Sequence, residues 1–271
     1  MFQEYPQKRA VITGGASGFG KACASLLLAE GWTVGIADIN PTHLAEAVAS
    51  WSNFPGKFFL YQIDVTQPED LQRVADEFTA QFGGVDIVIN CAGIAAGGEF
   101  ELFALADFNK VLDINFKGVL HSCKAFIPVL LKQQSGLIVN VASAAAFASA
   151  PLMSAYNVSK AAVASLTETL QAEYSTKSLR FALVMPTFFK SNLHQNIIGV
   201  GESLQSAHNL LTEAKIDAAW VAKQALKKVD CGSFYIVLPK DAKIVWFIKR
   251  LFPRLYIKIV GPLTERRMRK K

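Results

Sequence analysis

The chain has 271 residues, of which 51% are hydrophobic and 18% are charged, and its formal net charge is +6. This length and composition exclude a disordered chain, a disulfide-stapled small domain and a collagen-like repeat, and they allow one large domain or two small ones. Residues 240–271 carry a net charge of +9, which leaves −3 for the remainder and argues against a broad nucleic-acid surface.

Short apolar runs alternate with helical patterns along the chain. Seven runs predict strands, at residues 10–13, 33–37, 58–63, 85–89, 136–141, 179–184 and 234–238. Helical patterns lie at residues 22–30, 41–51, 68–82, 156–174 and 217–228, and a long helix runs through Asn115 toward Leu131. Continuous apolar strands between helices indicate a parallel sheet covered on both faces. We therefore predict a single-domain, doubly wound α/β fold of the Rossmann type with about seven strands over residues 1–240, followed by a tail over residues 241–271.

The first turn between a strand and a helix, residues 13–20, reads TGGASGFG. Glycines at this place let the backbone approach a pyrophosphate, and the helix N-terminus offers free N–H groups and partial positive charge. A tight turn that binds nothing is the alternative. The predicted cofactor-binding residues of this turn are Gly14, Ser17, Gly18, Phe19 and Gly20.

Asp38 ends the second predicted strand. A carboxylate there accepts hydrogen bonds from both hydroxyls of an adenosine ribose and repels a 2′-phosphate. The glycine turn holds no Arg or Lys, and Ile39 and Asn40 follow Asp38, so the sequence favours NAD over NADP as the cofactor. The alternative is that Asp38 caps the next helix, but Asn40 before Pro41 suits that role better.

Tyr156 and Lys160 lie at the start of a predicted helix, and their i, i+4 spacing places them on one face. A Tyr has an ordinary pKa of about 10, and a nearby ammonium group is expected to lower it toward the range of a useful base. Ser143 follows the fifth predicted strand, where its hydroxyl can hold a substrate oxygen. All three residues lie at carboxyl ends of strands, where ligands bind in open α/β sheets.

These motifs together resemble the short-chain dehydrogenase/reductase family over about residues 8–240. The matching stretches are TGGASGFG at residues 13–20, Asp64-Val65, NCAG at residues 90–93, Asn115, Ser143, Tyr156 and Lys160. The resemblance implies that Tyr156 is the general acid/base and Ser143 its partner, and that hydride passes between the substrate carbon and the nicotinamide ring.

The resemblance also implies further roles in cofactor binding. Asp64 would contact the adenine amino group, and Val65 would pack against the ring. Asn115 would bind a water that connects Lys160 to solvent. Residues 90–93 would support the sheet beside the cofactor through Asn90, Ala92 and Gly93.

The chain departs from the family after the sixth predicted strand, where it has Pro186-Thr187 in place of Pro-Gly. Pro186 and Thr187 are predicted to contact the cofactor, with Ser191 as the competitor of Thr187 for the nicotinamide amide. Residues 188–212 are expected to form a lid over the substrate.

Apolar residues dominate the candidate substrate pocket and indicate a lipophilic alcohol or ketone. The first four candidates are Phe147, Met153, Phe188 and Phe189, joined by Ile94, Ala95, Phe100, Ala145, Leu152 and Leu193. Each of them alone could instead belong to the core. We expect an NAD-dependent oxidoreductase of lipophilic alcohols. The alternatives are an NADPH-type 3-oxoacyl-thioester reductase, which Asp38 opposes, and a non-catalytic NAD-binding regulator.

The tail at residues 241–271 mixes apolar and basic side chains without a run long enough to span a membrane. Pro253 is expected to break it. An interfacial contact with a membrane is predicted from Trp246, Phe247, Phe252 and Tyr256 beside Lys249, Arg250, Arg254 and Lys258. The alternative is that the segment packs on the domain or on a sister subunit.

The remaining expectations concern assembly and location. By family resemblance, helices around residues 108–131 and 156–174 would pair with a sister subunit in a homodimer or homotetramer. The first strand begins near Lys8, which leaves no room for a signal peptide, so we expect a cytoplasmic protein, peripheral on the inner face of a membrane if the tail binds lipid. The four cysteines lack metal-ligand spacing and are expected to be small buried residues.

Overall fold

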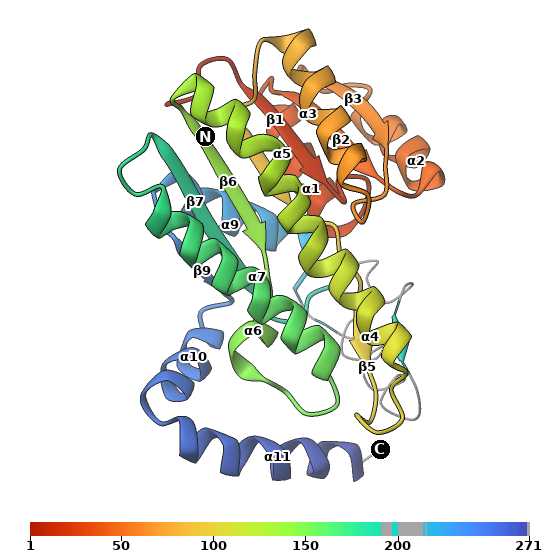
Figure 1. Ribbon diagram of the computed structural model, residues 1–271, viewed down its shortest axis with the longest axis vertical. Helices are drawn as coiled ribbons and strands as arrows, with labels where there is room; N and C mark the ends of the chain where they lie inside the picture. Colours follow the sequence, from red (N-terminus) through yellow and green to blue (C-terminus); the bar gives the residue numbers. More distant parts are fainter. Residues whose placement is uncertain (191–196, 200–213, 215, 270–271) are drawn as a thin grey trace.

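Seven strands form one parallel sheet in the order β3-β2-β1-β4-β6-β7-β9 (Figure 1). The computed structural model describes residues 1–190, 197–199, 214 and 216–269. The strands are β1 (Arg9–Thr13), β2 (Thr33–Asp38), β3 (Lys57–Gln62), β4 (Ile87–Asn90), β6 (Gly136–Val141), β7 (Leu179–Pro186) and β9 (Tyr235–Leu238). The central strands β4 and β6 are buried throughout, and apart from one asparagine in each, Asn90 and Asn140, they have no polar side chain, as expected for strands covered on both faces.

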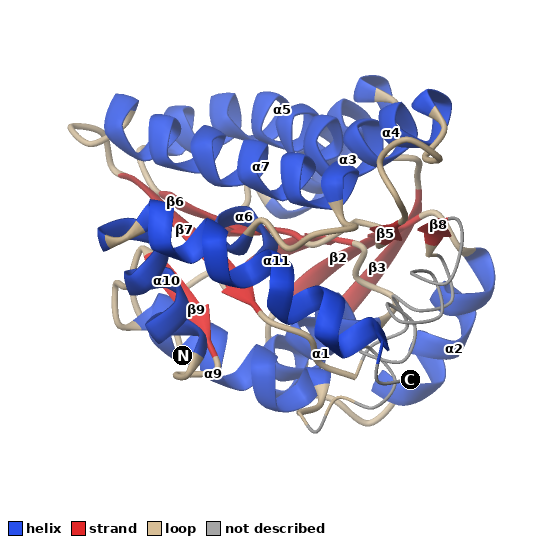
Figure 2. Cartoon of the chain, turned by 90° about the horizontal axis from the view of Figure 1, so that it is seen from below, coloured by secondary structure: helices blue, strands red, loops and turns tan. Residues whose placement is uncertain are grey.

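Helices cover both faces of this sheet (Figure 2). They are α1 (Gly18–Ala29), α2 (Pro41–Trp51) and α9 (Ala218–Asp230) on one face and α3 (Pro68–Phe82), α5 (Gly118–Gln133) and α7 (Ser154–Glu173) on the other. Each layer buries its own apolar cluster against the sheet. The predicted doubly wound α/β fold is confirmed.

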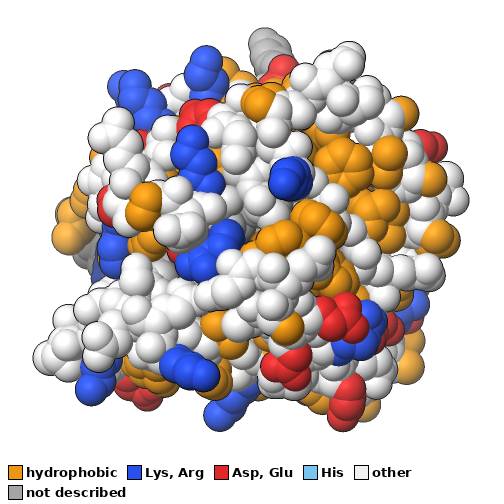
Figure 3. Space-filling model, turned by 90° about the horizontal axis from the view of Figure 1, so that it is seen from above, with side chains coloured by type: hydrophobic (Ala, Val, Ile, Leu, Met, Phe, Trp, Pro, Cys, Tyr) orange, Lys and Arg blue, Asp and Glu red, His pale blue; other side chains and the backbone are white. Residues whose placement is uncertain are grey.

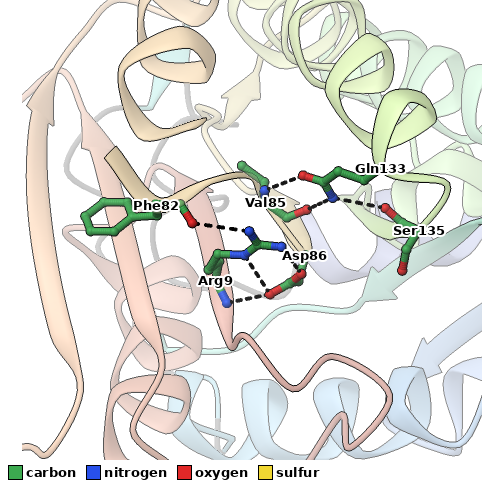
Figure 4. A network of polar contacts seen from close by, with 6 residues as sticks. All are labelled: Arg9, Phe82, Val85, Asp86, Gln133 and Ser135. Carbon is green, nitrogen blue, oxygen red and sulfur yellow. Dashed lines mark hydrogen bonds and ion pairs between the residues drawn. The ribbon is translucent and has the colours of Figure 1, made fainter. Parts of the chain in front are cut away.

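A polar network fastens the amino ends of the central strands (Figure 4). The Arg9 guanidinium donates to both carboxylate oxygens of Asp86, at 2.7 and 3.2 Å. The Gln133 side chain, at the end of α5, exchanges two hydrogen bonds with the backbone of Val85. An ion pair and side-chain amide hydrogen bonds therefore stabilise the amino ends of the strands. A ligand site is then expected at the opposite edge, at their carboxyl ends.

Several short elements differ from the predictions. The long helix predicted through Asn115 consists of three consecutive elements, which are α4 (Leu105–Leu112), a π-helical turn η1 (Asp113–Lys117) and α5. A second sheet pairs β5 (Ala96–Gly97) with β8 (Ile198–Gly199), and a one-turn helix α6 (Ala145–Ala148) follows β6. Two-residue strands and single turns carry too little periodicity to be seen in a sequence.

The C-terminal segment forms two helices, α10 (Ala242–Leu251) and α11 (Pro253–Arg269), which lie beyond the carboxyl ends of the strands (Figures 1 and 2). The predicted break at Pro253 is confirmed, because the first helix ends before it and the second begins there. Among the helices of the described residues, none is long and apolar enough to cross a membrane. The end of the molecule opposite to α10 and α11, which Figure 3 shows, carries both basic and acidic side chains.

Candidate active site

A cavity of about 1170 Å³ opens at the carboxyl ends of the strands. A site for one drug-sized ligand has roughly 300–1,000 Å³, so this space suits a dinucleotide together with a second molecule. Of the predicted site residues, the cavity is lined by Gly14, Ser17, Gly18, Phe19, Asp38, Asp64, Val65, Ala92, Gly93, Ser143, Phe147, Met153, Tyr156, Lys160, Pro186, Thr187, Phe188 and Phe189.

The glycine turn packs backbone against backbone at this cavity. A Cβ on Gly14 would lie 2.7 Å from the Cα of Ala92, and one on Gly20 would lie 2.1 Å from the carbonyl oxygen of Gly14. Gly14 and Gly18 also have positive φ angles, +63° and +49°, which favour glycine. Ser17 is the N-cap of α1, and its side chain makes no capping hydrogen bond. The turn is thus a cradle at a helix N-terminus, and it fits a pyrophosphate.

Asp38 is held rigidly beside this turn. One carboxylate oxygen accepts the N–H of Ala16 and the other accepts the N–H of Asn40, both at 3.1 Å. The cap of α2 is Asn40, whose side-chain oxygen accepts the N–H groups of Thr42 and His43. The prediction that Asn40 rather than Asp38 caps this helix is confirmed, and the Asp38 charge is fixed at the cavity wall.

Asp64 and Val65 follow β3 on the same wall. Asp64 accepts the N–H of Thr66 at 2.9 Å, so its carboxylate shapes its own turn. Val65 packs against α5, where a Cβ on Gly118 would come within 2.8 Å of the Val65 side chain. Both residues therefore have fixed positions at the cavity.

Tyr156 and Ser143 meet at the other end of the cavity, from α7 and the segment after β6. Burial raises the pKa of Tyr156 to about 12, and the strongest opposing influence is the Ser143 hydroxyl, which itself donates to the Pro186 carbonyl and accepts the Ala145 N–H. The expectation that Lys160 lowers the pKa of Tyr156 is wrong for this structure. The cost of moving a phenolate out of water is the dominant effect here.

Lys160 is buried one helical turn after Tyr156. Its ammonium group donates to the carbonyl of Val141 at 3.0 Å and lies 5.8 Å from the centre of the Tyr156 ring. Burial lowers the pKa of Lys160 to about 8. The predicted pairing of Tyr156 and Lys160 on one helix face is therefore realised, and both side chains line the cavity.

The lowered pKa of Lys160 predicts a pH-dependent stability. The unfolded chain, with its ordinary value of 10.5, binds more protons than the folded chain above pH 8, so stability rises with pH in that window. Relative to Lys160→Met, the free energy of unfolding of the unmodified protein should rise by up to about 3 kcal/mol between pH 8 and 10.5. Urea unfolding at both ends checks this, and a constant difference would contradict it.

Three of the predicted catalytic and cofactor-binding residues do not line the cavity and make other contacts. The side-chain oxygen of Asn115 accepts the N–H of Ile94 at 2.8 Å. Its side-chain nitrogen donates to the Ile94 carbonyl at 3.0 Å and to the Ser159 hydroxyl. Asn90 donates to the Asn140 side chain at 2.8 Å inside the sheet. Gly20 is close to the backbone of Gly14. These residues therefore lie behind the cavity wall, and the cofactor contacts of Asn90 and Gly20 stay predictions.

The remaining substrate and nicotinamide candidates divide into three groups. Ile94, Ala95 and Ala145 line the cavity with the four first candidates. Phe100 is 71% exposed, and neither it nor Leu152 lines the cavity. Thr187 does line it, whereas Ser191, Leu193 and most of the expected lid lie outside the described residues.

Sequence reasoning missed other parts of the wall. Ala242 and Val245 reach the cavity from α10, which no local motif could reveal. Cys91 also lines it, and burial raises the pKa of its thiol to about 11. Cys23 and Cys123 are buried as expected, whereas Cys231 is exposed.

Comparisons with known proteins agree with this geometry. The family model described as short chain dehydrogenase matches residues 8–199. A 3-oxoacyl-[acyl-carrier-protein] reductase, FabG, of Thermotoga maritima is 32% identical over 190 residues, which cover 70% of this chain and 77% of that protein. A 2-(R)-hydroxypropyl-CoM dehydrogenase of Xanthobacter autotrophicus is 32% identical over 190 residues, 69% of this chain and 76% of that protein. A short chain dehydrogenase/reductase from Burkholderia phymatum, solved in complex with NAD, has a TM-score of 0.81 at 31% identity and covers 87% of this chain and 90% of its own.

Proposed function

The chain belongs to the short-chain dehydrogenase/reductase family, and from this premise we propose that it is an NAD-dependent enzyme that interconverts a lipophilic alcohol and its carbonyl compound. Membership makes it an oxidoreductase with a nicotinamide cofactor. The observation that carries the proposal is the meeting of Tyr156, Ser143 and Lys160 in one cavity with the glycine turn and Asp38.

The residues of the cavity fit a nicotinamide dinucleotide. The backbone around Gly14 leaves no room for a Cβ, and helix α1 begins just after this turn. The Asp38 carboxylate, at the end of the neighbouring strand β2, is held in place by the N–H of Ala16 in the same turn. The cofactor, when bound, supplies or accepts the hydride. Every other part of the reaction falls to side chains of this chain.

Tyr156 is the proton donor and acceptor in this proposal. Its raised pKa keeps the phenol protonated near neutral pH, which is the state needed to give a proton to the oxygen of a carbonyl that is being reduced. In the oxidative direction the phenol must first release its own proton to solvent, and the resulting phenolate oxygen then takes the proton of the alcohol. Ser143 holds the substrate oxygen beside Tyr156. The Lys160 ammonium group lies one helical turn after Tyr156 and donates a hydrogen bond to the carbonyl of Val141.

The substrate class follows from the apolar end of the cavity. Ile94, Phe147, Met153 and Phe188 line it, and α10 adds Val245. These side chains offer no charge to a sugar or a hydroxy acid, so we propose a fatty, aromatic or polycyclic alcohol. Pairing with a sister subunit through α5 and α7 stays a prediction from the family.

The test is a panel of medium-chain, aromatic and steroid alcohols with NAD, and of their carbonyl compounds with NADH, followed by absorbance of the reduced cofactor. Turnover of several lipophilic members supports the proposal. The second candidate is reduction of a 3-oxoacyl thioester with NADPH, which the resemblance to the T. maritima reductase favours. A higher kcat/KM for a 3-oxoacyl thioester with NADPH, or no turnover of any alcohol or carbonyl compound in the panel, would overturn the proposal.

The preference for NAD is attributed to the charge of Asp38. Asp38→Asn keeps an acceptor for one of the two backbone N–H groups that Asp38 binds, and it removes the charge that repels a 2′-phosphate. We expect the ratio of kcat/KM with NAD to that with NADP to fall by at least about tenfold. Asp76→Asn, an exposed change on α3, is the matched control and should leave the ratio unchanged. An unchanged ratio in Asp38→Asn would remove the basis for choosing NAD.

A further inference from the structure

The C-terminal helix α10 is fastened to the body by one of its faces. Ala242 is buried there, and the Trp246 ring lies 5.5 Å from the ring of Tyr235 on β9. The Arg250 guanidinium lies over both rings, at 5.0 and 5.8 Å. The start of α11 is tied down as well, because the Tyr256 hydroxyl donates to the carbonyl of Ala148 on α6. These helices therefore have a defined inner side.

The outer side is apolar. Ile244, Phe247, Ile248 and Leu251 follow a helical spacing and are all exposed. Of the 17 large hydrophobic residues that are exposed in the described part of the chain, nine lie between Ile244 and Ile259. We call this set the apolar ridge; it comprises Ile244, Val245, Phe247, Ile248, Leu251, Phe252, Leu255, Ile257 and Ile259. Such a concentration marks an interaction surface.

The charges on the apolar ridge select the kind of partner. The exposed cations Lys243, Arg254 and Lys258 lie within it or at its ends, whereas Lys249 and Arg250 lie over the rings of Tyr256, Trp246 and Tyr235. Between residues 242 and 264 the sequence contains no acid. In a symmetric contact between two copies, the apolar ridge of each copy would offer no acid to the cations of the other, whereas anionic lipid headgroups neutralise them. Helices that carry apolar and basic side chains in this way lie in the plane of a membrane interface.

The apolar ridge is continuous with the active-site cavity. Val245 is 37% exposed and also lines the cavity. Ala148 and Ala242 line it beside Val245. In Figures 1 and 2, α10 and α11 extend past α6 at the end of the sheet that holds the site. The outer surface of these helices thus leads to the place where a lipophilic molecule would enter.

We propose that the apolar ridge docks the protein on the surface of an anionic bilayer, and that the lipophilic substrate enters the cavity from the lipid along Val245. The docking step rests only on the exposed apolar and basic side chains of α10 and α11. The entry step rests on the proposed function, since it requires a lipophilic substrate.

Flotation of the full-length protein with vesicles tests the docking step without any activity. We expect it to float with vesicles of phosphatidylcholine and phosphatidylglycerol, and to bind vesicles of phosphatidylcholine alone about tenfold more weakly. Leu251→Glu and the double change Arg254→Glu, Lys258→Glu should abolish flotation. Leu102→Glu is the matched control, because Leu102 is 62% exposed against 68% for Leu251 and lies outside the apolar ridge. It should float like the unmodified protein.

Two results would overturn the docking step. One is equal flotation, or equal absence of flotation, of the unmodified protein, Leu251→Glu and Leu102→Glu. The other is that Leu251→Glu breaks an oligomer in lipid-free buffer, measured by sedimentation, because a second copy would then cover the apolar ridge.

Kinetics with two alcohols test the entry step separately. For a long-chain alcohol dissolved in the vesicles, kcat/KM should fall at least about tenfold in Leu251→Glu, as membrane binding is lost. For a short, water-soluble alcohol it should be unchanged. Equal kinetics for both alcohols in the two proteins would overturn entry from the lipid. Absence of turnover in the unmodified protein would instead refute the proposed function and leave the flotation result valid.

Discussion

A Tyr156→Phe variant should lose turnover by about a thousandfold, within the range that general acid/base groups contribute. The phenol is the group that meets Ser143 at the cavity, and its high pKa makes it a proton store at neutral pH. Phenylalanine keeps the ring, so packing at the start of α7 changes little. Binding of NADH, followed by fluorescence titration, should stay within about threefold because the glycine turn and Asp38 are untouched.

The matched control for this change is Tyr174→Phe. It removes a hydroxyl from the end of the same helix, where the ring stacks on Phe181 and lies away from the cavity wall. Its turnover should equal that of the unmodified protein. If Tyr156→Phe also turned over at that rate, Tyr156 would not be the proton donor, and the proposed mechanism would fall.

A Gly20→Ala variant should weaken cofactor binding by about a hundredfold, which corresponds to nearly 3 kcal/mol. The new Cβ would lie 2.1 Å from the carbonyl oxygen of Gly14 and 2.9 Å from its carbon. Both are backbone atoms, so no side chain can rotate away, and the turn must move at the place where the pyrophosphate is expected. Calorimetric titration with NADH measures the loss.

Stability must be measured beside affinity for this variant. Gly261→Ala is the control, because a Cβ there meets nothing within 4 Å, and its affinity should be unchanged. Gly20→Ala should lose roughly 1–3 kcal/mol of unfolding free energy through overpacking. A Gly20→Ala protein that keeps full affinity for NADH would show that the turn does not hold the cofactor.

The sheet and the local motifs could be predicted because their information is close in sequence. Buried strands such as β6 are apolar at nearly every position, and the four-residue spacing of Tyr156 and Lys160 needs only a helix to bring them together. Asp38 is similar, since the end of a strand next to a glycine turn fixes where its carboxylate lies.

The parts that were missed depend on packing between distant segments. The pKa of Tyr156 is decided by how completely α7 and its neighbours exclude water, which no spacing reveals. The bonds of Asn115 to Ile94 and Ser159 join three elements. Val245 lines the cavity only because α10 folds back past α6. For the same reason the sequence could show the composition of the tail but not which of its faces is exposed.

The central claim is that the hydroxyl of Tyr156 lies beside the reactive ring of a bound nicotinamide cofactor. A crystal structure of the complex with NADH measures this distance directly. The account predicts that the ring carbon that gives the hydride lies within about 5 Å of the Tyr156 hydroxyl, close enough for one carbonyl group to touch both. A ring more than about 10 Å away, beyond the reach of any single substrate oxygen, would contradict it.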